Sequence, residues 1–168
     1  MKSSTSATPE TPLATARSLI VRQAEGLLLI LVTLWAGALW TVGFVVAPAL
    51  FRLIPERAMA GSIAGHLFVS VHWIAVIAGA YVLVFAIIRH GRAAVRHATV
   101  WLVVAMLTIV AIGALGIQPY IAELRFGMAS DAALRERFAM WHGVSSALYA
   151  LSSMLAVVLV VRVRRLFG

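Results

Sequence analysis

Residues 26–51 read GLLLILVTLWAGALWTVGFVVAPALF and contain no Asp, Glu, Lys or Arg. Three further stretches share this absence of charge, at residues 58–88, 97–122 and 138–161. Each is longer than the roughly 20 apolar residues with which an α-helix crosses the hydrocarbon core of a bilayer. The sequence therefore predicts an all-α integral membrane protein, a single-domain bundle of four transmembrane helices.

The composition of the whole chain supports the same class. Of the 168 residues, 62% are hydrophobic and 12% are charged, whereas soluble domains are about 45–50% apolar. A soluble globular domain is therefore excluded. The absence of cysteine excludes disulfide frameworks, thiolate nucleophiles and Cys-based metal sites. The net charge of +8 does not indicate nucleic-acid binding, because the Arg residues lie mostly at the ends of the predicted spans.

The predicted organisation has three parts. Residues 1–12 are small and polar, so we expect a flexible cytoplasmic tail there. Residues 13–25 combine apolar residues at helical spacing with Arg and Glu, which is typical of a short interfacial helix at the level of the lipid headgroups. The apolar run that follows is too long for a cleaved signal peptide. A four-span transmembrane domain is expected at residues 26–163, with spans at about 27–50, 62–88, 98–119 and 139–162.

A second interfacial helix is expected to lead into the fourth span. Leu134, Phe138 and Trp141 recur at helical spacing, and the residues between the first two are charged. Asp131 precedes this pattern and is a candidate N-cap, since its carboxylate can accept from the first backbone amides of a helix.

Lys and Arg are distributed unevenly between the two faces of this topology. The face with both termini and the second loop carries nine, at Lys2, Arg17, Arg22, Arg89, Arg92, Arg96, Arg162, Arg164 and Arg165. The opposite face carries five, at Arg52, Arg57, Arg125, Arg135 and Arg137. Because cytoplasmic loops carry the excess of basic residues, we expect a multi-pass protein of the bacterial cytoplasmic (inner) membrane with both termini in the cytoplasm.

Polar side chains from three predicted spans fall into one layer near the outer face. His66, Gln118 and His142 lie there, with Met140 nearby. Imidazole and thioether are the ligands that a soft ion such as Cu(I) prefers in a cysteine-free protein. The sequence therefore predicts a candidate soft-metal site formed by these four residues. The alternative interpretation is that the histidines are ordinary interfacial residues and the methionine fills an apolar gap.

A b-type haem is the second candidate cofactor. Haem of this kind needs two histidines at matching depth on adjacent helices, which His66 and His142 could supply. No catalytic triad, carboxylate pair, phosphate loop or HExxH motif is present in the sequence, so we do not expect an enzyme.

Other polar residues lie within the spans. A rise of 1.5 Å per residue places His72 level with Thr41, Thr108 and Ser152, and we expect it to hydrogen-bond to one of them rather than to act as a proton relay or ligand. Ser145 and Ser146 are expected to bond to their own helix or to a neighbour.

Two segments resemble a known family. Residues 34–51, with Trp40, Gly43 and Pro48, form the first. The second is residues 138–146, FAMWHGVSS, which match the pattern Phe-x-x-(aromatic)-His-Gly-x-Ser-Ser. Over about residues 27–161 the chain resembles the transmembrane protein 205-like family, which in bacteria corresponds to the domain of unknown function 4149 group.

The resemblance implies a small four-span membrane protein. The eukaryotic relative is associated with resistance to a platinum drug, and the family is compared with copper-resistance membrane proteins. Gln118 stands where relatives carry an acidic residue, and His66 stands where Lys or Arg is expected. Of the candidate site residues, the resemblance therefore supports only His142.

Three functions follow as hypotheses. The first is handling or passage of a small solute such as a soft metal ion, in metal or drug tolerance, with His142 as the principal residue. The second is a haem-binding redox membrane protein. The third is a structural or accessory subunit. Beyond the lipid bilayer, the expected partners are a second copy of the chain or another membrane protein, and not nucleic acid.

Overall fold

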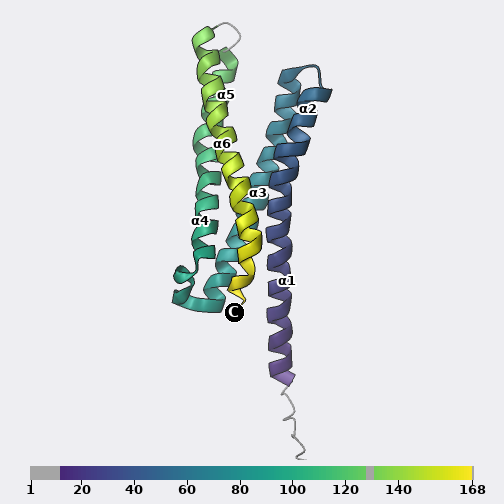
Figure 1. Ribbon diagram of the computed structural model, residues 1–168, viewed down its shortest axis with the longest axis vertical. Helices are drawn as coiled ribbons and strands as arrows, with labels where there is room; N and C mark the ends of the chain where they lie inside the picture. Colours follow the sequence, from purple (N-terminus) through teal and green to yellow (C-terminus); the bar gives the residue numbers. More distant parts are fainter. Residues whose placement is uncertain (1–11, 128–130, 168) are drawn as a thin grey trace, which may run out of the picture.

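The computed structural model describes residues 12–127 and 131–167. The predicted tail at residues 1–12 lies outside this part of the chain except for its last residue. Every element within the described residues is helical, and four of the helical stretches are long and apolar enough to cross a membrane, at Ser18–Leu53, Arg57–Arg96, Ala98–Arg125 and Ala132–Leu166. The predicted all-α fold with four spans is confirmed (Figure 1).

The helices follow one another closely along the chain. In order they are α1 Pro12–Trp40, η1 Thr41–Val46, α2 Ala47–Leu53, α3 Arg57–His90, η2 Gly91–Arg96, α4 Ala98–Ala111, η3 Ile112–Ile117, α5 Gln118–Gly127, α6 Ala132–Arg162 and η4 Val163–Leu166. The segments η1 and η3 are π-helical turns, whereas η2 and η4 are 3₁₀-helical.

The two expected interfacial segments run directly into their spans. Residues 13–25 form the first turns of α1, which runs on without a break into the first span. Residues 132–138 likewise form the start of α6. Asp131 caps α6 as predicted, because its carboxylate accepts a hydrogen bond from the Ala133 amide at 2.8 Å.

The first and third spans contain the same local irregularity. In each span a six-residue π-helical turn ends two residues before a proline, at Pro48 and at Pro119. Proline cannot donate to the residue four positions earlier and its ring collides with that carbonyl. A π-helical turn contains one extra residue per turn and relieves this conflict without ending the span.

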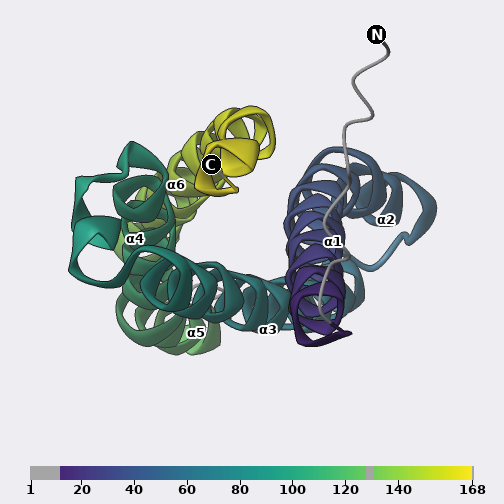
Figure 2. The same cartoon turned by 90° about the horizontal axis from the view of Figure 1, so that it is seen from below.

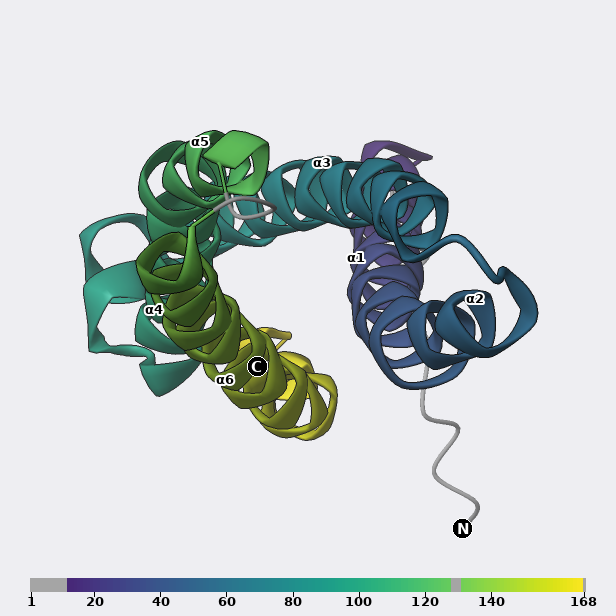
Figure 3. The same cartoon turned by 90° about the horizontal axis from the view of Figure 1, so that it is seen from above.

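The chain therefore consists of two hairpins of similar design. Each has a span with a π-helical turn and proline, a short connection, and a long returning helix, α3 or α6. Viewed along the long axis, α1 lies opposite α4 and α3 lies opposite α6 (Figures 2 and 3). Helix α1 packs on both α3 and α6, and α4 packs on the same two helices. The two hairpins are therefore related by an approximate two-fold rotation about an axis that runs along the bundle.

The core is concentrated away from the hairpin connections. Leu28, Val32, Val82 and Leu159 are almost completely buried there. The C-terminal end is attached to this region, since His90 bonds to the Leu166 carbonyl at 3.0 Å. At the other end, α1–α2 and α5–α6 diverge (Figure 1). Large apolar side chains cover the outside of the spans, as expected for helices that face lipid.

Candidate binding pocket

A pocket of about 770 Å³ lies among the four spans on the side of the diverging hairpin ends. It extends from Arg57 and Arg125 at those ends to Trp35 and Ala75 near the middle of the bundle, and we call it the interhelical pocket. Its volume lies within the range of about 300–1,000 Å³ that is usual for small-molecule sites.

Small residues on α3 create much of the space. Gly61, Ala64 and Gly65 line one wall, and no other side chain or neighbouring helix comes within 4 Å of the position that a Cβ would take at Gly65. These small residues therefore form an open wall here rather than a close helix contact. The opposite walls are formed by apolar side chains such as Phe44, Phe51 and Leu148.

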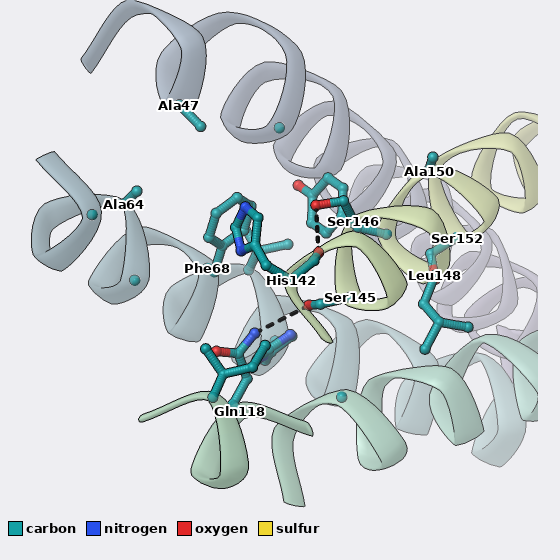
Figure 4. Close-up of a pocket in the computed structure, with 18 of the residues that line it drawn as sticks. Ala47, Ala64, Phe68, Gln118, His142, Ser145, Ser146, Leu148, Ala150 and Ser152 are labelled. Carbon is teal, nitrogen blue, oxygen red and sulfur yellow. Dashed lines mark hydrogen bonds between the residues drawn. The ribbon is translucent and has the colours of Figure 1, made fainter. Parts of the chain in front are cut away.

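The polar cluster of the pocket comes from α5 and α6. Gln118 Nε2 donates to Ser145 Oγ at 3.3 Å, and Ser146 Oγ donates to the His142 carbonyl at 2.9 Å (Figure 4). The His142 ring stacks on Phe138, with ring centroids 5.8 Å apart and planes 5° from parallel. His142 and Gln118 are both exposed in the pocket, so they are available to a bound molecule.

Tyr149 of α6 packs between α6 and the first span. Its hydroxyl donates to the Leu39 carbonyl at 2.7 Å. The ring packs on Gly43 so closely that a Cβ there would collide with it. Its other face meets Phe68 of α3 edge-on, with the centroids 5.1 Å apart. Tyr149 therefore connects three spans in the wall of the pocket.

The deep end of the pocket contains polar side chains that are buried or half-buried. The Trp35 side chain is only 1% exposed, and its indole N–H is buried without a hydrogen-bond partner among the described residues. His72 is half-buried there, and Ser152 is buried. A buried N–H without a partner costs about 1–3 kcal/mol.

His72 does not form the predicted hydrogen bond. In the part of the chain that the structure describes, it bonds to none of Thr41, Thr108 and Ser152. The Thr108 hydroxyl instead donates to the Val104 carbonyl of its own helix at 2.9 Å. Thr41 and Thr108 do not line the pocket, whereas His72 and Ser152 do. Depth along a span does not determine the directions in which the neighbouring side chains point.

The pocket is positively charged. Arg57 and Arg125 line it, and no Asp or Glu is found among the described residues of its lining. Neither arginine forms an ion pair or hydrogen bond within residues 12–127 and 131–167.

The structure brings together two of the four candidate metal ligands. Gln118 and His142 line the pocket, but His66 and Met140 do not. His66 faces away and uses Nδ1 in a 2.9 Å bond with the Ser62 carbonyl of its own helix, and Met140 is 56% exposed. Among the described residues, no group of three or more His, Cys, Asp or Glu side chains is placed to hold a metal ion. The pocket therefore contains His142 but not His66, the second imidazole that the predicted soft-metal or haem site requires.

The residues that sequence reasoning missed are Trp35, Arg57, Arg125 and Tyr149. Arg57 was counted only for orientation, and Arg125 was placed just above the outer polar layer without a role, although both lie at hairpin connections on the same face of the predicted topology. Pro48 and Pro119, near the ends of the first and third spans, were a usable signal for the two-hairpin design. No local pattern in the sequence indicated that Tyr149 would face Gly43.

The comparison with protein families gives a definite result. The profile described as Domain of unknown function (DUF4149) matches residues 30–130, more than half of the chain. The chain belongs to the DUF4149 family. The DUF4149 match covers the later part of the first span and all of the second and third, including Trp35, Arg57, Gln118 and Arg125, and ends before α6. No curated protein and no solved structure matches the chain.

Proposed function

We propose that this DUF4149 protein binds a small solute within the membrane and handles it there, with the interhelical pocket as the binding site. The pocket itself carries the proposal, since residues from all four spans line it and its volume fits a small organic molecule. Polar side chains inside a membrane are costly and are usually retained for a function. Gln118, His142 and Ser145 are such side chains, and they gather on this pocket.

An organic solute fits the lining better than a bare ion does. Most of the lining is apolar, and only two of the four proposed metal ligands reach it. A soft metal ion held by His142 with Gln118 is the competing solute in the same site. Kinship with the transmembrane protein 205-like family, and with it metal or drug tolerance, rests on residues 138–146 and is part of this competing proposal.

The setting of the site is part of the proposal. The excess of Lys and Arg at the terminal ends of the spans supports both termini in the cytoplasm of a bacterium, with the pocket then opening on the outer half of the inner membrane. The haem and accessory-subunit hypotheses make different predictions, namely a Soret absorption band and a protein that co-purifies in mild detergent.

The test compares the wild-type protein with Gly65→Leu and Gly37→Leu. Both glycines are exposed with no heavy atom near the Cβ position, but only Gly65 lines the pocket. Native mass spectrometry and elemental analysis of the three purified proteins then report any bound molecule or metal. We expect an adduct that Gly65→Leu removes and Gly37→Leu retains.

The competing outcomes are distinct. Copper or zinc that is lost in His142→Ala would support the soft-metal solute, and iron with a Soret band would support haem. An adduct that Gly65→Leu does not change, or the absence of any adduct and metal, would refute the proposed function.

A further inference from the structure

Two guanidinium groups are the only charged groups in the described lining of the interhelical pocket. They belong to Arg57, at the start of α3, and Arg125, in α5. These elements come from different hairpins, so only folding brings both charges to the lining of one pocket. The pocket therefore presents a positive end built from both halves of the chain.

Neither charge is neutralised by the described residues. Elsewhere in the protein an arginine is given a partner: Arg89 donates to the Phe167 carbonyl at 3.0 Å. Arg57 and Arg125 have no such bond within the described ranges, although Glu56 and Glu123 are close to them in sequence. Charged groups at the edge of a low-dielectric region attract an opposite charge more strongly than they do in water.

The remaining pocket is long and apolar. Arg57 and His72 are 15 positions apart in α3, which corresponds to roughly 22 Å at 1.5 Å per residue. The acyl chains of one leaflet occupy about half of the ~30 Å hydrocarbon core. An acyl chain with its head group at the arginines therefore fits along the pocket between α3 and α6.

The two unpaired charged groups of the pocket are donors only, because a guanidinium has no acceptor. A ligand that satisfies them must supply acceptor oxygens at the hairpin connections.

We propose that the interhelical pocket binds an anionic amphiphile, an acyl chain with a carboxylate or phosphate head group held by Arg57 and Arg125. This proposal rests on the proposed function and names its solute class. It predicts that the head group lies at the hairpin connections and that the chain passes Gly65 toward the middle of the bundle.

Binding is measured by native mass spectrometry of the full chain released from a non-ionic detergent. The probes are oleate, dioleoyl phosphatidylglycerol and oleyl alcohol, the last of which has the chain of oleate without its charge. Oleate represents a free fatty acid and phosphatidylglycerol represents a bilayer lipid, so the two anionic probes separate the sources. We expect at least one anionic probe to bind about tenfold or more tightly than oleyl alcohol, because hydrogen bonds to charged groups contribute about 1.5–3 kcal/mol.

Substitutions of the two arginines test whether they hold the anionic head group. Arg57→Gln and Arg125→Gln should each weaken the anionic probe about tenfold or more, and Arg57→Lys should restore most of the affinity. Arg52→Gln is the matched control, because Arg52 lies in α2 close to Arg57 and is exposed but does not line the pocket.

The outcomes separate this inference from the proposed function. Equal binding of oleate and oleyl alcohol, with no effect of either Arg→Gln variant and full sensitivity to Gly65→Leu, would overturn the anionic head group but leave the pocket as a binding site. Binding that is insensitive to Gly65→Leu for every probe would overturn both.

Discussion

The phenolic ring of Tyr149 lies directly against Gly43, and its hydroxyl donates to the Leu39 carbonyl. In a regular α-helix this carbonyl would accept from the Gly43 amide, because the amide of each residue bonds to the carbonyl four residues earlier. The contact coincides with the π-helical turn Thr41–Val46. A side chain of the fourth span is therefore inserted where the first span departs from regular geometry, in the wall of the binding pocket.

The first prediction concerns the space at Gly43. Gly43→Ala should lower the stability of the protein in detergent by about 1–3 kcal/mol, the usual cost of overpacking, because the added methyl group collides with the Tyr149 ring. Gly37→Ala lies earlier in the same span with open space around it, and should be neutral or stabilising because alanine is the better helix former. Thermal unfolding of both variants beside the wild type measures the difference. Equal effects of the two substitutions would show that the Gly43 contact is not tight.

The second prediction concerns the Tyr149 hydroxyl. Tyr149→Phe keeps the ring but removes the group that bonds to the Leu39 carbonyl, so we expect a loss of about 1 kcal/mol. Hydrogen exchange at the residues of η1 should accelerate in this variant. Phe68→Leu is a useful comparison, since it disturbs the edge-on ring contact and leaves the hydroxyl in place. If Tyr149→Phe left exchange in η1 unchanged, the hydroxyl would have no part in holding the π-helical turn.

The number of spans was predictable because the cost of burying charge in lipid leaves long uncharged runs in the sequence. The N-cap at Asp131 was predictable because capping is local. Residues 13–25 were expected to feed directly into the first span, and they form the first turns of α1; an amphipathic pattern alone does not determine whether such a helix bends at the interface.

The site was predictable only in part. Depth along a span follows from residue number, and it placed His142 and Gln118 in one layer. The rotation of each helix about its own axis does not follow from residue number. This rotation turns His66 away from the pocket and brings Arg57 and Arg125 into it. The residue types therefore suggested a soft-metal site. The directions of the side chains instead give a positively charged and mostly apolar pocket.

The third prediction concerns the hydrogen bond between Gln118 and Ser145, which joins the two spans of the second hairpin at 3.3 Å. A double-mutant cycle of Gln118→Ala and Ser145→Ala should give a coupling free energy of about 0.6 kcal/mol, the average for such bonds between membrane helices. The same cycle with Ser146 in place of Ser145 should give none, because Ser146 bonds to the His142 carbonyl of its own helix. Coupling in both cycles would indicate that Gln118 bonds to α6 in more than one way.

The fourth prediction concerns the start of α6, which positions His142 two to three turns later. Asp131→Ala removes the acceptor of the Ala133 amide and should destabilise the first turn by about 1 kcal/mol, the usual cost of losing an N-cap. Asp131→Asn should behave like the wild type, because an Asn side chain also caps. Hydrogen exchange in the first turn of α6 measures the effect. Because α6 is held by Tyr149 and the Gln118–Ser145 bond further along, fraying should stop before His142. If exchange rose as far as His142 in Asp131→Ala, the cap would be required for the pocket itself.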